Sequence, residues 1–198
     1  MEVRWSDGDS FKFQSGPHKG SGVRLQDFNT LESYGPVHRW GKWTAQELYD
    51  IARTSKGLGA EGVWNCSAAG EKDGYGRLLV SCPDAARALI AAGHAHAFGV
   101  EGTPDPSLMS VQKKAQRQGK GIWKKGVPDR LLTSLHSADE GSGYNRTVDT
   151  SAGSSSVRSH DETYEICQEV CEGLKQGGSC MTYVPYKMRY RNKPDCLN

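Results

Sequence analysis

The stretch VRWSDGDSFKF, residues 3–13, alternates apolar and polar side chains on both sides of an Asp-Gly turn. Two alternating runs joined by Asp-Gly are a strong signal for a β-hairpin. A second turn, Gly16–Gly20, leads to a third alternating run at Val23–Gln26. The sequence therefore predicts a three-stranded meander at the start of the chain.

Helical periodicity begins after the meander. Thr44 followed by Glu47 is typical of a capping box, and Leu48 begins an apolar face with a helical period. We expect this helix to stop at Gly57 and Gly59, because glycine is a common helix terminator. A second helix is expected at residues 85–92, after Pro83, and a third at residues 107–119, after Pro106.

A second hairpin is expected between the first two helices and encloses a glycine-rich turn. Its strands would be Val63–Cys66 and Arg77–Cys82. Cys66 and Cys82 either face each other across the two strands or are two small buried residues. Five short strands with helices between and after them favour an α+β fold, and specifically a five-stranded OB-type Greek-key barrel with three helices.

The remainder of the chain has a different composition. Residues 128–160 are rich in Ser, Gly, Asp and Thr, which predicts a linker or a loosely wrapped extension. Residues 163–174 follow a helical pattern that places Cys167 and Cys171 on one face, so each would bond to a partner outside that helix. The expected domains are 1–127 for the barrel with its helices, 128–160 for the linker, and 161–198 for a Cys-rich C-terminal extension.

The cysteines indicate an exported protein. The chain has six, and four of them crowd its last part without a Cys-x-x-Cys pair. Disulfides are favoured, and a four-cysteine zinc site is the alternative. The candidates are Cys66, Cys82, Cys167, Cys171, Cys180 and Cys196. We therefore expect a secreted or periplasmic protein, and because Met1–Asp9 lacks the apolar core of a signal peptide, we expect any leader to have been removed.

The overall charge identifies no partner. The chain has 25 Lys and Arg against 23 Asp and Glu, a net charge of +2. Its longest apolar stretch, Ala85–Gly93, contains Arg87 and is too short to cross a bilayer, so a membrane-spanning protein is not expected. Residues 107–128 carry six basic residues and no acidic one. This segment is either a solvated helix face or a patch that binds nucleic acid.

Three separated segments carry residues suited to one reaction. They are the Asp7-Gly8-Asp9 turn, Arg24 with Glu32, and a loop that ends at Arg77. Guanidinium groups bind phosphate oxygens with two parallel hydrogen bonds and stabilise negative charge on phosphorus. A carboxylate can accept the proton of an attacking water. Taken alone, each segment also fits an ordinary turn, strand or surface position.

The order and spacing of these segments resemble the staphylococcal nuclease (thermonuclease) family over about residues 3–126. The matching segments are Asp7-Gly8-Asp9-Ser10, Val23-Arg24-Leu25, Asn29-Thr30-Leu31-Glu32, Tyr34-Gly35-Pro36, Asp73-Gly74-Tyr75-Gly76-Arg77 and Gly121-Ile122-Trp123. The resemblance implies an OB-type barrel and calcium-dependent hydrolysis of DNA and RNA that leaves 3′-phosphate ends. No obligate protein partner is evident, and we expect a monomer.

The resemblance also implies a role for each matching residue. Arg24 and Arg77 would contact the scissile phosphate, and Glu32 would be the general base. Asp9 and the backbone carbonyl of Thr30 would ligate Ca²⁺. Tyr75 would contact the nucleotide, and the basic residues Lys113 and Lys114 are further candidates for substrate binding.

One position departs from the family pattern. Asn29 stands where the family has a second calcium-binding aspartate, so the site carries one negative charge fewer and should bind Ca²⁺ more weakly. Asp27 either compensates for this change or is an ordinary exposed carboxylate. Asn29 is also the residue that favours the alternative function, a catalytically inactive OB-fold module that binds nucleic acid or protein.

Overall fold

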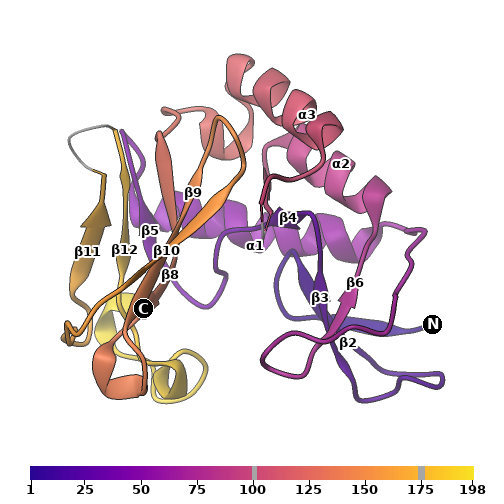
Figure 1. The fold of residues 1–198 in the computed structure, drawn as a ribbon, viewed down its shortest axis with the longest axis horizontal. Helices are drawn as coiled ribbons and strands as arrows, with labels where there is room; N and C mark the ends of the chain where they lie inside the picture. Colours follow the sequence, from indigo (N-terminus) through magenta and orange to yellow (C-terminus); the bar gives the residue numbers. More distant parts are fainter. Residues whose placement is uncertain (100–101, 174–176) are drawn as a thin grey trace.

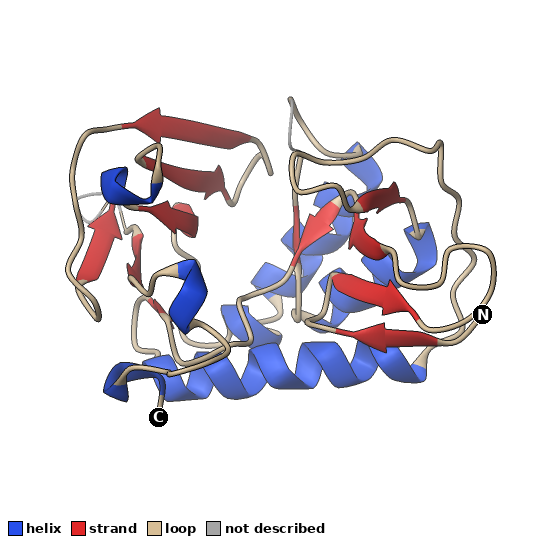
Figure 2. Ribbon diagram, turned by 90° about the horizontal axis from the view of Figure 1, so that it is seen from below, coloured by secondary structure: helices blue, strands red, loops and turns tan. Residues whose placement is uncertain are grey.

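The molecule contains two groups of strands, one at each side. One long helix, α1 (Ala45–Glu61), runs along both groups (Figures 1 and 2). The computed structural model describes residues 1–99, 102–173 and 177–198. The helix contacts β1 (Val3–Trp5) in one group and β5 (His38–Arg39) in the other. We call these groups, with the elements packed on them, the N-terminal and C-terminal lobes.

The N-terminal lobe contains the predicted meander. Its four-stranded sheet has the order β1-β2-β3-β6, with β3 and β6 parallel and the other pairs antiparallel. A second pair joins β4 to β7 in antiparallel register. The remaining strands of this lobe are β2 (Ser10–Phe13), β3 (Gly22–Leu25), β4 (Phe28–Asn29), β6 (Leu78–Val80) and β7 (His96–Ala97).

The predicted second hairpin is wrong in its first strand. Residues 63–66 form no strand, and only isolated bridges, Ser67 to Ser81 and Lys72 to Leu78, join this region to β6. Val63 is 99% exposed. Trp64 packs on the core and its Nε1 donates to the Gly59 carbonyl at 2.8 Å, so this segment is held by that side chain and by a disulfide rather than by a strand ladder.

All three helices are present. Thr44 caps α1 through the expected capping box with Glu47, but the helix continues through Gly57 and Gly59 to Glu61. Gly59 is inside the helix because the ring of Trp5 packs against it, with Trp5 Cζ3 2.9 Å from where a Cβ would stand. The other two helices are α2 (Pro83–Ala92), which ends at a left-handed Gly93, and α3 (Pro106–Arg117).

The segment expected to be a linker forms a sheet. Residues 130–159 contain three antiparallel strands in the order β10-β9-β8. Their bounds are β8 (Arg130–His136), β9 (Tyr144–Asp149) and β10 (Ser155–Ser159). Leu131, Leu132 and Leu135 are buried beneath the sheet. The Ser and Thr side chains that suggested a loop bond across the strands instead, as Thr147 does with Ser156.

The helix expected at 163–174 is also wrong. The described part of that range contains β11 (Glu169–Glu172), and residue 174 lies outside the described residues. Strand β11 pairs with β12 (Ser179–Thr182), which pairs in turn with β5. Because β5 lies between β4 and α1 in sequence, this sheet joins the C-terminal extension to the first part of the chain.

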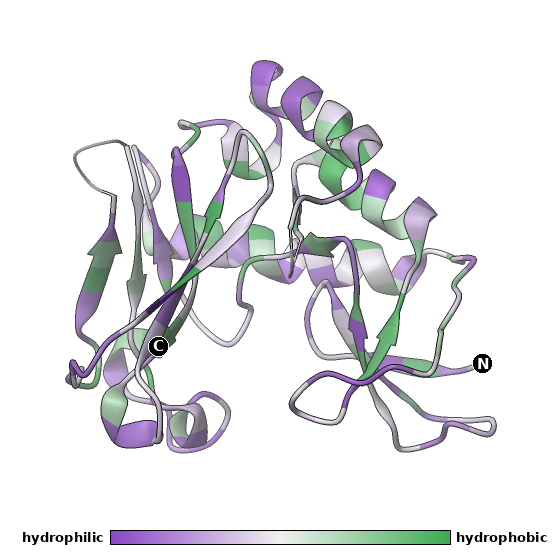
Figure 3. Cartoon of the chain, in the orientation of Figure 1, coloured by the Kyte–Doolittle hydropathy of each residue, from purple (hydrophilic) through white to green (hydrophobic). Residues whose placement is uncertain are grey.

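The structure confirms a mixed α and β fold. In the described residues the four sheets have four, three, three and two strands, and none closes into a barrel. No described helix is long and apolar enough to cross a membrane. Hydropathy follows the packing, since the end of α3 that points away from the sheets is hydrophilic (Figure 3).

Candidate active site

Arg24 and Asp9 form an ion pair at the centre of the N-terminal lobe. Arg24 lies on β3 and also donates from Nη2 to Asn29 Oδ1 at 2.5 Å. Oδ2 of Asp9 accepts from the backbone N–H of Thr30 at 2.8 Å and from its hydroxyl at 3.2 Å. Burial opposes ionisation, but the charge of Arg24 and these hydrogen bonds lower the pKa of Asp9 to about 2.

Two further carboxyl groups lie near Asp9. Asp7 accepts a hydrogen bond from the backbone N–H of Asp9 at 3.3 Å. Burial and the negative charges of Asp9 and Glu32 raise the pKa of Asp7 well above its usual range. We call Asp7, Asp9 and Glu32 the carboxylate cluster. Sequence reasoning assigned no ligand role to Asp7, although it belongs to the same Asp-Gly-Asp turn.

Glu32 lies within electrostatic reach of three arginines. Burial raises the pKa of its carboxyl, the charge of Arg189 opposes that rise, and Asp9 adds to it. Arg24 and Arg77 also act to lower this pKa. The charges of Arg24 and Arg77 therefore act on Glu32, and so does that of Arg189 from the C-terminal extension, while no hydrogen bond or ion pair in the described residues joins the Glu32 carboxylate to any of the three.

Arg77 stands at the end of a loop organised by Asp73. The Asp73 carboxylate accepts from Arg77 Nε at 2.7 Å and from the backbone N–H groups of Tyr75 and Arg77 at 2.9 and 3.0 Å. The guanidinium carbon of Arg77 lies 5.6 Å from the centre of the Tyr75 ring. A disulfide between Cys66 and Cys82 closes the base of this loop and limits how far Arg77 can move.

Asn29 takes part in the hydrogen-bond network. Its Oδ1 accepts from Arg24, and its Nδ2 lies 3.4 Å from Nε2 of His96. The Asp27 carboxylate accepts from Ser81 at 3.0 Å, and no hydrogen bond in the described residues joins its side chain to Asn29 or Asp9.

Two buried histidines lie behind the cluster, and sequence reasoning missed the role of both. The backbone N–H of Glu32 donates to Nε2 of His38 at 3.1 Å. The proton of His38 is therefore on Nδ1, which has no hydrogen-bond partner among the described residues. Burial, together with the neighbouring His96, lowers the pKa of His38 to about 3. Burial also lowers the pKa of His96 to about 4.

The two predicted lysines lie apart from the cluster. Lys113 and Lys114 are exposed on α3, which packs on α2. Within the described ranges, no hydrogen bond or ion pair joins them to the carboxylate cluster. Their role in substrate binding stays a prediction.

The six cysteines form three disulfides, which confirms the prediction of disulfides rather than a zinc site. The pairs are Cys66–Cys82, Cys167–Cys196 and Cys171–Cys180. Cys167 and Cys171 each bond outside their own segment, as expected. Three disulfides are typical of an oxidising, extracellular-type environment.

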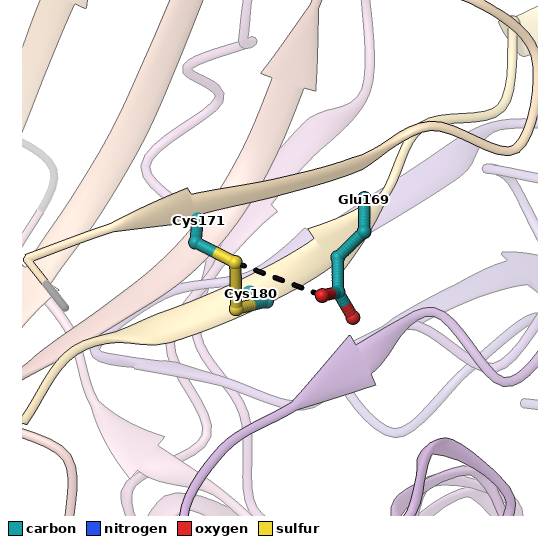
Figure 4. A group of neighbouring side chains, drawn as sticks. All are labelled: Glu169, Cys171 and Cys180. Carbon is teal, nitrogen blue, oxygen red and sulfur yellow. Dashed lines mark hydrogen bonds between the residues drawn. A yellow bond between two sulfur atoms is a disulfide. The ribbon is translucent and has the colours of Figure 1, made fainter.

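Glu169, Cys171 and Cys180 place ligand-type atoms within 4.8 Å of one another (Figure 4). The two sulfurs are bonded to each other, so neither is the thiolate that a metal would need. The Glu169 carboxylate is bound by Arg39, whose Nε donates at 2.6 Å. This group therefore forms a structural contact between β11 and β5.

The carboxylate cluster has the chemistry of a site for a hard cation. Its donors are all oxygens, from Asp7, Asp9, Glu32 and the Asn29 amide, and Ca²⁺ binds such groups. Besides burial, which is the larger cause, repulsion from Asp9 and Glu32 raises the pKa of Asp7. A divalent cation would relieve that repulsion, so the residues fit the ion that the resemblance implies.

A scan of the chain against models of known protein families finds no match, and a search of curated proteins finds none either. The resemblance to the staphylococcal nuclease family therefore rests on the sequence motifs alone.

Proposed function

We propose that this protein is an exported nuclease that hydrolyses phosphodiester bonds of DNA and RNA with the help of Ca²⁺, leaving 3′-phosphate ends. The observation that supports the proposal is that the charges of Arg24 and Arg77 both act on Glu32 of the carboxylate cluster. Arg24 and Glu32 are close in sequence, Arg77 comes from a separate segment, and all three match the family motifs in order.

Glu32 is the proposed general base. Its raised pKa makes it a better proton acceptor than an exposed glutamate, while Arg24, Arg77 and Arg189 keep enough positive charge nearby for the carboxylate to ionise. In the proposed reaction Glu32 takes a proton from water, and the water oxygen attacks phosphorus in line with the 5′ oxygen. The bond from phosphorus to the 5′ oxygen breaks, and that oxygen takes a proton from solvent.

Arg24 and Arg77 are the proposed phosphate ligands. Each has a guanidinium held by a carboxylate, Arg24 by Asp9 and Arg77 by Asp73. This pairing fixes the direction of the planar group before substrate binds, which reduces the ordering cost of binding. As negative charge builds on phosphorus, both guanidinium groups stabilise it.

Asp7, Asp9, Asn29 and the Thr30 carbonyl would hold the cation. A bound Ca²⁺ would supply positive charge to the phosphate and would help to orient the attacking water. Asp9 would have to share its oxygens between the ion and Arg24.

We further propose that the N-terminal lobe is an OB-type barrel in an open form. The β1-β2-β3-β6 sheet, the β4-β7 pair and helices α1 and α2 support this assignment. The active-site residues would then lie at one end of the barrel strands, on β3, at the start of β6 and after β4.

The alternative is a catalytically inactive OB-fold module that binds nucleic acid or protein. One observation favours this alternative. The guanidinium of Arg24 binds both Asp9 and Asn29, so it occupies the oxygens that a metal cation would need. Such a protein would bind single-stranded DNA without cutting it.

The test is degradation of plasmid DNA by the oxidised protein, with added Ca²⁺ or with excess chelator. We compare the native protein with Glu32→Gln and with Glu61→Gln, which removes an exposed carboxylate at the end of α1. Calcium-dependent cutting should fall by about two orders of magnitude or more in Glu32→Gln, as expected for loss of a general base, and stay unchanged in Glu61→Gln.

Each of the other outcomes counts against a specific part of the proposal. Cutting that survives the chelator removes Ca²⁺ from it. Equal cutting by Glu32→Gln overturns the role of that residue. No cutting by folded native protein that still binds single-stranded DNA supports the binding module.

A further inference from the structure

The C-terminal extension places an arginine that forms no ion pair within the described residues near the proposed catalytic base. Arg189 follows the short helix at Tyr186–Met188, and its guanidinium carbon lies 5.0 Å from the centre of the Tyr34 ring. Its Nε donates to the Val184 carbonyl at 3.1 Å. In the described part of the chain, its two terminal nitrogens form no hydrogen bond or ion pair. They remain available to an incoming anion.

A second such cation lies on β9. The guanidinium carbon of Arg146 stands 5.9 Å from the centre of the Phe98 ring, and none of the ion pairs within the described ranges involves Arg146. The charges of both Arg146 and Arg189 reach Tyr144 and His136, so the two arginines belong to one local surface. By contrast, Arg158 on β10 is neutralised by Glu162 and Glu172.

Tyrosines from both lobes meet at this surface. Burial, and secondarily the neighbouring Tyr75, raise the pKa of Tyr144 to about 12, so Tyr75 of the N-terminal lobe lies near Tyr144 of the C-terminal lobe. Tyr190 is 64% exposed and its ring centre lies 6.2 Å from that of Tyr34. Burial and the charges of Glu32 and Asp7 raise the pKa of Tyr190 to about 12, so it lies near the carboxylate cluster.

The extension is anchored to the segment that follows Glu32. Lys193 donates from Nζ to the Tyr34 carbonyl at 2.7 Å, and Leu197 packs directly on Gly35. Met181 on β12 pairs with His38 on β5. The Cys167–Cys196 disulfide closes the chain around Arg189 and Tyr190. These contacts hold the two residues in one position relative to Glu32.

We propose that the C-terminal extension supplies the second half of the substrate-binding site, in which Arg189 binds a backbone phosphate next to the scissile one and Tyr190 stacks on a neighbouring base. We call Tyr144, Arg146, Arg189 and Tyr190 the C-terminal face. The inference rests on the proposed nuclease function and assigns single-stranded nucleic acid as the ligand of this face.

Single-stranded nucleic acid fits the chemistry of the C-terminal face. Guanidinium groups match phosphate oxygens, and exposed aromatic rings stack on unpaired bases without regard to sequence. Arg24 and Arg77 would contact the scissile phosphate, and the C-terminal face would contact the phosphate next to it. Duplex DNA shows no unstacked base to Tyr190, so we expect single strands to bind more tightly.

The competing explanation is that Arg189 only neutralises Glu32. Both roles predict that Arg189→Ala shifts the acid limb of the pH–rate profile to higher pH, because the charge of Arg189 lowers the pKa of Glu32. Only a phosphate contact also predicts a change in KM and in the salt dependence of binding.

The experiment measures KM and kcat on a single-stranded oligonucleotide, and binding of the same oligonucleotide in chelator at several salt concentrations. The proteins are the native chain, Arg189→Ala, Arg189→Lys, Tyr190→Ala and the control Arg158→Ala, with folding checked by thermal unfolding. Arg189→Ala should raise KM about tenfold, the size expected for one charged hydrogen bond. It should also reduce the slope of log K against log salt by about 0.7, which is one phosphate contact.

The controls and the remaining variants separate the possible outcomes. Arg189→Lys should keep the salt slope and recover part of KM, Tyr190→Ala should weaken binding with little change in slope, and Arg158→Ala should behave as native. Active Arg189→Ala protein with native KM and salt slope overturns the inference and leaves the nuclease in place. A native chain that binds but never cuts refutes the nuclease, while the binding data still test the C-terminal face.

Discussion

Asn29 shows how one residue changes the balance of charge in the site. Its amide accepts from Arg24 on one side and faces His96 on the other. An aspartate there would strengthen the bond to Arg24 and add a carboxylate to the would-be cation site. The asparagine therefore lowers the negative charge available to Ca²⁺ while it keeps the hydrogen-bond network.

We predict that Asn29→Asp tightens calcium binding, because an added carboxylate increases the charge that the ion neutralises. Isothermal titration calorimetry of the native protein and the variant measures the difference. Asp27→Asn is the matched control, since Asp27 bonds to Ser81 and should leave the affinity unchanged. Equal affinity of native protein and Asn29→Asp would show that position 29 is not at the metal.

Sequence reasoning found residues of the site that belong to motifs and missed those that do not. Arg24, Glu32 and Arg77 have fixed spacing relative to turns and strands, and the fold brings them together. His38 and Arg189 carry no local pattern. His38 matters because a backbone N–H of the site donates to it, and Arg189 because a distant segment folds back. Both facts depend on tertiary structure.

At the scale of elements, α1 shows that glycine need not end a helix. The helix passes Gly57 and Gly59 for different reasons. Nothing lies within 4 Å of the Cβ position of Gly57, whereas Gly59 is buried against the ring of Trp5. Gly57 therefore only lowers the stability of the helix, through the backbone entropy that glycine loses on folding. Gly59 permits a close contact between the helix and the sheet.

We predict opposite effects from the same substitution at these two sites. Gly57→Ala should stabilise the protein by roughly 0.5–1 kcal/mol, because alanine loses less entropy in a helix. Gly59→Ala should destabilise it by about 1–3 kcal/mol, because Trp5 must move. Urea unfolding of the two variants and the native protein gives both values. Destabilisation by Gly57→Ala would mean that the helix needs its flexibility there.

The errors at this scale have physical causes. The short strands β2 and β3 follow the Asp7-Gly8 turn and the Gly16–Gly20 turn, and both could be predicted. Strands β9 and β10 could not, because their Ser and Thr residues satisfy one another across the sheet and imitate a loop in composition. The expected helix near Cys167 failed because the spacing of cysteines reflects disulfides here. Cys167 itself has a positive φ of 68° that no helix allows.

For the whole molecule, the buried histidines set the response to acid. His38 and His96 have pKa values of about 3 and about 4 in the folded protein. Unfolded histidine has a pKa of about 6.5, so the unfolded chain binds more protons between these values. Stability is therefore lost as pH falls below about 6.5. Asp7 and Glu32, whose pKa values are raised, act in the opposite direction.

We predict that His38→Gln makes the free energy of unfolding less dependent on pH, because glutamine can accept the same hydrogen bond and does not titrate. Between pH 6.5 and pH 5 the native protein should lose roughly 2 kcal/mol more than the variant. Comparing the two proteins cancels the contribution of the carboxyl groups. Thermal or urea unfolding at both pH values is the measurement, with exposed His18→Gln as control. Equal slopes would place His38 in contact with solvent.

The contacts between the C-terminal extension and the segment after Glu32 have a consequence for how the protein is made. The contact between Lys193 and Tyr34 joins residues 159 positions apart. Synthesis delivers Glu32 early, and Arg189 arrives only with the last part of this sequence. The Cys167–Cys196 bond that would hold Arg189 in place forms only after the chain reaches an oxidising compartment. On the proposals above, the protein reaches its full affinity for single strands only after export, once this disulfide has formed.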